Sequence, residues 1–300
     1  MRETVTYPHL DWFSKEHGIS AEALIRIYTI EKAFHNSILV TDCAEERARQ
    51  YEQLYTEVHR IKHEGEIGEP LEGTVDQHAR LVRTFRRELK GRSVLDVGCG
   101  NGRFLDQVAR LLPHGCLCGL DTSEVDMPRD HAGIQFLKGS IIDFRLDRKF
   151  DVVYSHQVLE HIAPADLPAH LRSVHSALEP DGTFIVLLPN KYWGPQDITR
   201  IVDNTFTGRL PAAGSHLNES SYTDLAPQLE GAGFGNVRTI LPFAAFIPPL
   251  RSMRVRPWIN RMLERHSRLR NAANRVHAHG RPIFRNPVVL ICRRASPGGV

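Results

Sequence analysis

A strand, a glycine-rich turn and a helix follow one another between residues 94 and 112, and no other feature of the chain constrains the fold as much. The run Val94–Val97 is mainly apolar and predicts a buried strand. Three glycines follow at alternate positions: Gly98, Gly100 and Gly102. Apolar residues then recur at helical spacing from Phe104 to Leu112. Glycines let a ligand approach bare backbone, so the segment predicts the ligand-binding edge of an open α/β sheet, suited to a nucleotide-like molecule.

The chain continues as an alternation of predicted strands and helices. Short apolar runs predict strands at residues 93–97, 116–120, 134–137, 151–155, 183–188, 236–241 and 287–292. Helical patterns separate several of these strands, among them residues 168–178 and 225–232. Strands that alternate with helices favour a parallel, doubly wound sheet with helices on both faces. We therefore expect an α/β fold.

Residues 1–73 have a different character. Apolar residues recur at helical spacing within residues 10–63, and residues 64–73 form a linker rich in glycine and acidic residues. We expect residues 1–73 to be an N-terminal helical extension that acts as a lid or as the contact of a homodimer. Residues 74–300 are then one domain, which carries an insertion at residues 243–286 before its last strand.

Composition places the chain among ordinary globular proteins, since 41% of its 300 residues are hydrophobic and 24% are charged. The sequence contains no apolar run of the length that a membrane-spanning helix needs. Its N-terminal residues lack the apolar core of a signal peptide. These observations predict a cytoplasmic protein and argue against an integral membrane protein.

Positive charge is concentrated in the last part of the sequence. Residues 248–300 hold twelve arginines, no lysine and one acidic residue, Glu264, so this segment carries a charge of +11 and residues 1–247 carry −8. Pro257 can begin a helix whose apolar residues share one face, with the arginines mostly off that face. The apolar residues are Trp258, Ile259, Met262, Leu263 and Leu269, and the arginines are Arg261, Arg265, Arg268 and Arg275.

Three interpretations of this arginine-rich segment stay open. It can be a solvated basic face. Residues 248–286 can bind a phosphate-bearing substrate or an anionic membrane surface, which would place the protein at the periphery of the inner membrane. The segment can also bind RNA, although no signature of an RNA-binding module accompanies it. Arginine rather than lysine favours fixed contacts with phosphate or carboxylate groups.

An acidic residue ends the second predicted strand. Asp121 lies 23 residues after Gly98, and Thr122 follows it. In open α/β sheets an acidic residue at this place accepts hydrogen bonds from ribose hydroxyls. Because the glycine turn precedes it, we expect Asp121 to bind a ribose, with capping of the next helix as the alternative.

Several of these segments resemble the motifs of one enzyme class. Asp96 and the three glycines form the pattern D-x-G-x-G-x-G, which resembles motif I of the class I S-adenosylmethionine-dependent methyltransferases. Residues 119–123 (GLDTS) resemble motif II, and residues 150–162 resemble motif IV. The resemblance covers residues 75–242 and 287–293. It implies a Rossmann-like sheet of seven mostly parallel strands, S-adenosylmethionine (SAM) as the cofactor, and methyl transfer.

The resemblance also implies roles for individual residues around the cofactor. Asp96 orients the methionine amino end, the glycines let the backbone approach, and Asp121 holds the ribose. The residues implied for cofactor binding are Asp96, Gly98, Gly100, Gly102, Asp121, Thr122, Ser140, Ile141 and Ser155. The family usually has an aspartate next to the adenine where this chain has Ser140, and Asp143 is a candidate substitute.

Candidate catalytic residues follow the fourth predicted strand. Gln157, Glu160 and His161 are spaced to share one side of a helix. The pattern Q-x-x-E-H resembles the E-x-x-E-H site of two metal-dependent O-methyltransferase groups. One makes ubiquinone precursors, and the other methylates the terminal 2′-hydroxyl of small RNAs. In the RNA enzymes a histidine that matches His216 completes the metal shell.

Three interpretations of Glu160, His161 and His216 stay open. Together they can hold a divalent ion such as Mg²⁺, although Gln157 replaces a charged ligand. His161 or His216 can instead act as a general base without a metal. In the third interpretation Glu160 and His161 only stabilise their helix and loop.

The loops after the fifth strand predict the acceptor site. Residues 191–194 and Asp197 come where this class places its substrate loops, and residues 216–222 are expected to line the acceptor pocket. Tyr192 and Trp193 can stack on a sugar or aromatic substrate, or serve as core aromatics. We expect O-methylation of a small molecule, a sugar or lipid-linked glycan, or a natural product. Methylation of an RNA hydroxyl and a non-catalytic SAM-binding scaffold are the alternatives.

Overall fold

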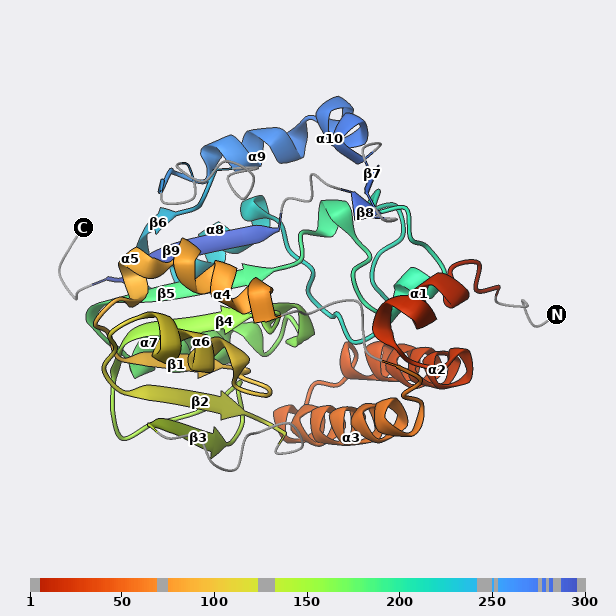
Figure 1. The fold of residues 1–300 in the computed structure, drawn as a ribbon, viewed down its shortest axis with the longest axis horizontal. Helices are drawn as coiled ribbons and strands as arrows, with labels where there is room; N and C mark the ends of the chain where they lie inside the picture. The colour runs from red at the N-terminus through yellow and green to blue at the C-terminus, as the bar shows by residue number, and fades with distance from the viewer. Residues whose placement is uncertain are drawn as a thin grey trace.

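The structure is a computed structural model that describes residues 6–68, 75–123, 133–241, 250, 253–274, 277–278, 281–282 and 287–295 (Figure 1). Its strands are β1 (Val94–Val97), β2 (Leu117–Asp121), β3 (Ile134–Lys138), β4 (Phe150–His156), β5 (Leu178–Leu188), β6 (Phe234–Arg238), β7 (His277–Ala278), β8 (Arg281–Pro282) and β9 (Val288–Arg294). Its helices are α1 (Leu10–His17), α2 (Ala21–Ile38), α3 (Ala44–Glu64), α4 (Val75–Thr84), α5 (Arg86–Leu89), α6 (Arg103–Leu111), α7 (Leu167–Ala177), α8 (Tyr222–Gly231), α9 (Trp258–Arg265) and α10 (Ser267–Asn274). Short 3₁₀ helices are η1 (Leu159–His161), η2 (Lys191–Trp193) and η3 (Ile198–Ile201).

Seven strands form one sheet in the order β3-β2-β1-β4-β5-β9-β6. Neighbours from β3 to β5 are parallel, and β9 is antiparallel to both β5 and β6. The expected α/β fold with a seven-stranded, mostly parallel sheet is therefore confirmed. The strand order reverses between β1 and β4, and in open α/β sheets such a reversal leaves a ligand-binding crevice at the carboxyl ends of the strands.

Helices cover both faces of the sheet with apolar side chains. One cluster packs α7 and α8 on the sheet through residues such as Leu171 and Leu225. The other packs α4, α5 and α6 through residues such as Phe85 and Val108. Strand β4 serves both clusters, because successive side chains of a strand point to opposite faces. This double burial explains why its sequence is a nearly continuous apolar run.

The N-terminal residues form helices, as expected. Helices α1, α2 and α3 enclose a third apolar cluster that includes Ile198, Ile201 and Leu217 from beyond β5. A buried ion pair joins Arg200 to Glu16 of α1 at 3.0 Å. The three helices therefore pack on loops at the carboxyl ends of the strands (Figure 1). The predicted boundary at residue 73 lies outside the described residues.

Helix α9 begins directly after Pro257, as predicted for the insertion. It contacts α8, and with α10 it lies above β6 in the view of Figure 1. Residues 243–249 and Arg275 of the predicted insertion lie outside the described residues. Among the residues that the structure describes, no helix is both long enough and apolar enough to span a membrane.

Candidate active site

The turn after β1 depends on glycine at two positions. Gly98 has a φ of 76°, and a Cβ atom there would lie 2.3 Å from Cγ2 of Val158. Gly100 has a φ of 49°, and a Cβ atom there would meet no atom within 4 Å, because this residue faces a cavity. Gly102 follows as the N-cap of α6. A ligand can therefore reach bare backbone beside a helix N-terminus.

Asp121 connects the end of β2 to this turn. Its carboxylate accepts hydrogen bonds from the backbone N–H of Gly100 at 2.8 Å and of Ser123 at 3.0 Å. It also lines the cavity beside Gly98 and Gly100, and Thr122 lines the cavity next to it. A carboxylate has about four acceptor positions, so Asp121 can hold the turn and still accept from a ligand hydroxyl.

Asp96 in β1 is the second acidic residue at this end of the sheet, and it is only 4% exposed. Burial, followed by the negative charge of Asp121, raises its pKa to about 8. A positively charged ligand would stabilise both carboxylates. Asp121 and the open backbone at Gly100 line the cavity, whereas Asp96 lines neither cavity and interacts with the charge of Asp121 from a buried position. This arrangement suits a cationic ligand with a ribose, and SAM has both features.

Two adjoining cavities lie at this place. The first has a volume of about 210 Å³ and is lined by the glycine turn and Asp121. The second has a volume of about 250 Å³ and is lined by the loop after β3, which includes Ser140. Both cavities share the lining residues Tyr55, Thr122, Ile141 and His161. The residues expected at the ribose and the adenine therefore border one continuous region.

Helix α3 supplies lining residues that sequence reasoning missed. Tyr55 lines both cavities, Tyr51 lines the second and His59 the first. Burial raises the pKa of Tyr55 well above its ordinary value, so its hydroxyl stays protonated. The available signal was the four-residue spacing of these three side chains, which places them on one side of a helix.

Some of the residues expected at the cofactor line neither cavity, namely Asp96, Gly102, Ser155 and the candidate substitute Asp143. Ser155 is fully buried within β4, and neither cavity includes it among its lining residues. Asp143 is exposed and lines a third cavity with Arg145 and Arg148, which shares Ser140 with the second cavity. The hydroxyl of Ser140 accepts the N–H of Ile142 at 3.1 Å, so it stabilises its own loop.

Glu160, His161 and His216 converge, as the metal and base hypotheses both require. One ligand atom of each residue lies within 4.8 Å of the others, and the ring centroids of His161 and His216 are 4.7 Å apart. Gln157 does not share their side of a helix, so that expectation was wrong. It precedes the single turn of η1, has a φ of 58°, and lines the cofactor cavity instead.

The three groups of this cluster differ strongly in pKa. Burial raises the pKa of Glu160 to about 7, and its Oε2 atom has no hydrogen-bond partner. Burial and the adjacent His216 lower the pKa of His161 to about 3. Burial acts to lower the pKa of His216, but Glu219, Asp197 and Glu160 together raise it to about 9. At neutral pH the cluster therefore combines a neutral imidazole, an imidazolium and a carboxyl group close to its titration point.

Both imidazoles are oriented through Nδ1. His161 donates from Nδ1 to the carbonyl of Ser215 at 3.1 Å, and His216 donates from Nδ1 to the buried carboxylate of Glu219 at 2.7 Å. Nε2 of each ring is left for a further partner, which is the usual arrangement of metal-ligating histidines. With the unpartnered Oε2 of Glu160, the residues fit a divalent ion.

The loop 214–218 that carries His216 is fixed from two sides. The carbonyl of Glu160 accepts the N–H of Leu217 at 2.6 Å. From helix α2, Glu31 accepts the N–H of Ser215 at 2.7 Å. The N-terminal helices therefore help to position the histidine of the candidate site, although α2 lies far from it in the sequence.

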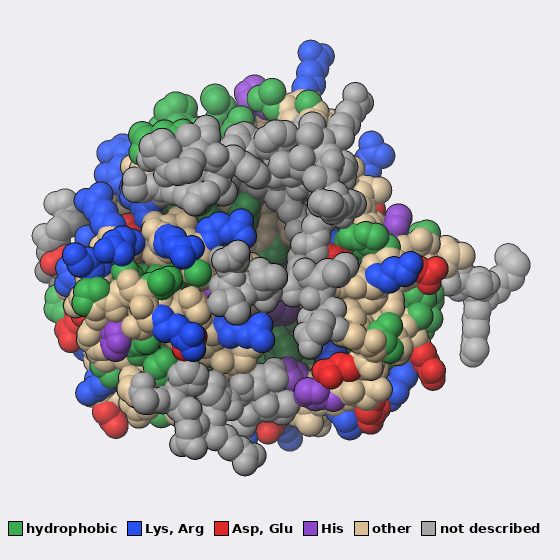
Figure 2. Space-filling model, in the orientation of Figure 1, with side chains coloured by type: hydrophobic (Ala, Val, Ile, Leu, Met, Phe, Trp, Pro, Cys, Tyr) green, Lys and Arg blue, Asp and Glu red, His purple; other side chains and the backbone are tan. Residues whose placement is uncertain are grey.

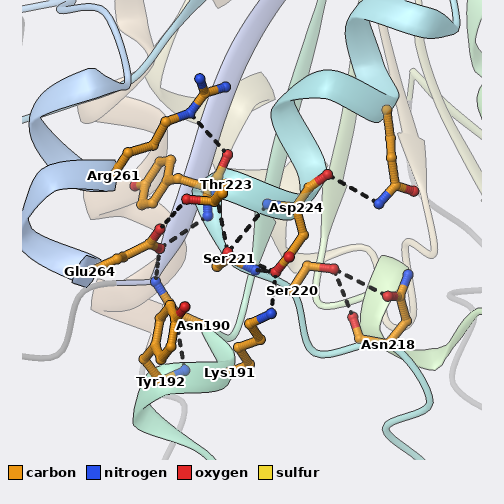
Figure 3. Close-up of polar contacts among 12 residues, drawn as sticks. Asn190, Lys191, Tyr192, Asn218, Ser220, Ser221, Thr223, Asp224, Arg261 and Glu264 are labelled. Atoms are coloured by element: carbon orange, nitrogen blue, oxygen red, sulfur yellow. Dashed lines mark hydrogen bonds and ion pairs between the residues drawn. The ribbon is translucent and has the colours of Figure 1, made fainter. Parts of the chain in front are cut away.

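The loops after β5 make more internal contacts than expected. Trp193 is 5% exposed, so it is a core aromatic rather than a stacking surface. Asp197 is buried and accepts the N–H groups of Thr199 at 2.9 Å and Gly214 at 2.8 Å. Lys191 pairs with Asp224 at 2.7 Å (Figure 3).

The strand order, with its antiparallel β9, and the glycine turn followed by an acidic strand end define the class of SAM-dependent methyltransferases. Comparison with known proteins agrees. The sequence model of the family described as "Methyltransferase domain" matches residues 74–239, more than half of the chain. The chain belongs to this family, and its fold is that of the class I SAM-dependent methyltransferases.

Relatives of known name support this assignment. The ubiquinone biosynthesis O-methyltransferase of Methylobacterium nodulans is 28% identical over 165 residues, which are 50% of this chain and 63% of that protein. A protein of Mycolicibacterium smegmatis, named a probable SAM-dependent methyltransferase, is 29% identical over 164 residues, 53% of this chain and 58% of that protein. The chain thus spans less than two thirds of the length of these relatives.

A solved structure shows the same fold. The 1,6-didemethyltoxoflavin-N1-methyltransferase of Burkholderia thailandensis superposes with a TM-score of 0.51 at 14% identity, over 85% of this chain and 92% of that one. At this identity the likeness concerns the architecture alone.

Proposed function

We propose that the protein transfers the methyl group of SAM to a hydroxyl oxygen of a small molecule, a sugar or lipid-linked glycan, or a natural product. The cluster of Glu160, His161 and His216 carries the proposal, because it is buried beside the cofactor cavities and His161 lines both. A hydroxyl loses its proton when it is methylated, and the cluster offers a group to receive it. Relatives named O-methyltransferases support an oxygen acceptor.

We further propose roles for the residues around the cofactor, which the lining of the two cavities supports for all of them except the buried Asp96. SAM supplies, when bound, a methyl group on a positively charged sulfur. We assign Asp121 to the ribose and Asp96 to the methionine amino end. Ser140 and Ile141 flank the adenine, and Tyr55 closes the cavity from α3. Holding the acceptor in line with the methyl group contributes most of the rate, since effective molarity can lower such barriers by about 7–11 kcal/mol.

In the metal-free form of this proposal the proton acceptor is Glu160, not His161 or His216 as the sequence suggested. A pKa of about 9 leaves His216 already protonated at neutral pH, and a pKa of about 3 makes His161 a weak base. Oε2 of Glu160 has no hydrogen-bond partner and the pKa of this carboxyl group is close to 7, so it can take a proton at neutral pH. His216, bonded to Glu219, supplies positive charge next to the acceptor oxygen. In the metal form, a divalent ion would be held by Glu160, His161 and His216. The ion would then supply the positive charge next to the acceptor oxygen in place of the imidazolium of His216.

One experiment tests the proposal and separates its two forms. We expect Glu160→Gln and His216→Ala each to reduce methyl transfer to a pool of hydroxyl-bearing acceptors by at least about a hundredfold. His63→Ala, at an exposed position of α3, is the matched control and should keep full activity. Retained activity in Glu160→Gln and His216→Ala would contradict the role of the cluster.

Calorimetric titration with Mn²⁺ gives the second readout. The metal form is established if the wild type binds one Mn²⁺ ion, if Glu160→Gln and His216→Ala do not bind it, and if a chelator abolishes the activity of the wild type. Full activity after thorough chelation leaves the metal-free base.

We also propose that residues 1–73 act as a lid over the cofactor and that residues 74–300 form the methyltransferase domain, because α3 lines both cavities. A homodimer contact through the extension and a cytoplasmic location remain part of this proposal. An RNA hydroxyl is the second candidate acceptor, since Arg256, Arg265 and Arg268 are exposed. Activity on RNA would fall steeply with salt concentration, whereas activity on a neutral small molecule would change little.

A further inference from the structure

Helix α9 presents two of its large apolar residues to solvent and buries two polar ones, while Ile259 and Leu263 are half-buried. Asn260 and Glu264 are 0% and 2% exposed, whereas Trp258 is 59% and Met262 45% exposed. Leu269 of α10 continues the exposed side at 54%. The amphipathic pattern of the sequence predicts the opposite orientation for a helix that packs on a globular core.

Buried hydrogen bonds fix this orientation. The carboxylate of Glu264 accepts from Nδ2 of Asn190 at 2.6 Å and from the N–H of Tyr222 at 3.0 Å, at the start of α8 (Figure 3). Asn260 donates from Nδ2 to Oγ1 of Thr239 at 3.2 Å. A rotation of α9 that buried Trp258 would remove these partners, and unpaired buried polar groups are strongly unfavourable. The apolar side is therefore held outward.

Exposed arginines accompany this side of α9, and the described residues of the segment offer no exposed acidic group. Arg256, Arg265 and Arg268 are exposed, and the single acidic residue of the segment, Glu264, is buried. In Figure 2 apolar side chains gather along the upper edge of the molecule, over α9. Arg254 does not contribute, because it pairs with Glu88 at 2.8 Å and is itself largely buried.

We propose that this face, composed of Trp258, Met262, Leu269, Arg256, Arg265 and Arg268, docks on the surface of an anionic lipid bilayer. A helix that lies in the interface buries its apolar side among the acyl chains while arginines reach the lipid phosphates. Tryptophan suits the boundary between acyl chains and headgroups. A second copy of the chain is a less favourable partner for this face, because a symmetric contact would bring the arginines of the two copies together. The inference depends on neither the acceptor nor the metal.

Flotation of the full chain with vesicles, in the absence of SAM, tests the proposal. We expect binding to phosphatidylcholine vesicles that contain phosphatidylglycerol, and none to phosphatidylcholine alone. The double variant Trp258→Ser, Met262→Ser should bind at least about tenfold more weakly. Replacement of Arg256, Arg265 and Arg268 by Gln should weaken binding by about a hundredfold, at about fivefold for each arginine, and added salt should act in the same direction. The matched control Val40→Ser, Ile67→Ser removes exposed apolar side chains elsewhere and should bind like the wild type.

Fluorescence gives an independent readout. Of the three tryptophans, Trp193 is buried and Trp12 is half-buried with Arg200 over its ring, whereas Trp258 is 59% exposed. A blue shift of emission on adding anionic vesicles should therefore come from Trp258 and disappear in Trp258→Phe, which keeps the other two tryptophans. Equal binding to neutral vesicles, or binding that the serine and glutamine variants keep, would overturn the proposal. The proposal would also be overturned if the wild type did not bind vesicles and instead formed a concentration-dependent dimer that the serine variant disrupts. Binding of SAM to each variant, measured separately, distinguishes failed docking from a failed cofactor site.

Discussion

Asp121 and Asp96, which we propose to act at the cofactor site, lie on neighbouring strands in different environments. Asp121 lies at the cavity and accepts two backbone N–H groups. Asp96 is buried one strand away, where burial and the charge of Asp121 raise its pKa to about 8. Asp96 therefore holds a proton at neutral pH in the absence of a cation, whereas Asp121 uses its carboxylate to fix the glycine turn.

The raised pKa of Asp96 predicts a pH-dependent affinity for SAM. A nearby ammonium group favours the carboxylate, so binding expels the proton that Asp96 holds below about pH 8. Affinity should rise with pH by up to about tenfold per unit between pH 6 and 8, then level off. Calorimetry at several pH values measures this. Asp96→Asn should bind SAM more weakly, and its affinity should lose the part of the pH dependence that the titration of Asp96 causes. The titration of SAM itself affects both proteins equally, so the same pH dependence in the variant and the wild type would refute the assignment of Asp96.

Asp121 predicts a second effect on affinity. Asp121→Ala removes an acceptor for the ribose and also releases the N–H of Gly100. Since a hydrogen bond to a charged group contributes about 1.5–3 kcal/mol, SAM should bind at least about tenfold more weakly. The control is Asp143→Ala, which alters an exposed acid on a different cavity and should leave the affinity unchanged. Equal affinity in a folded Asp121→Ala protein would remove Asp121 from the cofactor site.

At the scale of elements, a buried ion pair joins α3 to the loop before α7. Nε of Arg47 lies 3.0 Å from Oδ1 and 2.9 Å from Oδ2 of Asp166, and both side chains are 7% exposed. The hydroxyl of Tyr51 donates to the same carboxylate at 3.3 Å and accepts the N–H of Ala163 at 2.7 Å. The position of α3, and with it the wall of the cofactor cavity, depends on this contact.

Arg47→Met should therefore destabilise the protein. It leaves the Asp166 carboxylate buried without its cation, which lowers the free energy of unfolding by about 3–5 kcal/mol. Arg49→Met is the matched control: Arg49 pairs with Glu46 on the surface of the same helix, with side chains 67% and 47% exposed, and the change should stay within about 0.5 kcal/mol. Urea denaturation measures both, and similar values for the two variants would show that the buried pair does not anchor α3.

The sequence predicts helices and strands where the local pattern of apolar residues determines them. It does not predict the orientation of a residue or helix that depends on contacts with residues far away in the sequence. The apolar runs predicted the strands correctly, and a cavity lies beside the glycine turn, where the sequence predicts the cofactor. Gln157 was misplaced because its N–H bonds to the carbonyl of Leu187 on the neighbouring strand, and the chain leaves β4 through a turn. The direction of α9 depends on Glu264, whose partners Asn190 and Tyr222 lie 74 and 42 residues away. Periodicity identifies two faces of a helix without saying which one the protein covers.

At the scale of the whole molecule, the cofactor region joins parts of the chain that are far apart in sequence. Tyr55 from α3 and His161 from beyond β4 border the same two cavities. The face of α9 lies elsewhere: α3 and α9 are at opposite edges of the molecule in Figure 1. Cofactor binding and membrane docking should therefore act on different parts of the protein.

Hydrogen exchange can test this separation on the full chain. Local unfolding that disrupts the cavity must also release SAM, so bound SAM raises the free energy of such unfolding. The backbone amides of α3 should therefore exchange more slowly, by up to about a hundredfold when the SAM concentration is a hundred times Kd. The amides of α9 should not change, because α9 lines neither cavity. Anionic vesicles should produce the reverse pattern, with protection of α9 and little change in α3. Unchanged exchange of α3 at saturating SAM would mean that the N-terminal helices do not close over the cofactor, and protection of both helices by either ligand would mean that the two regions are coupled.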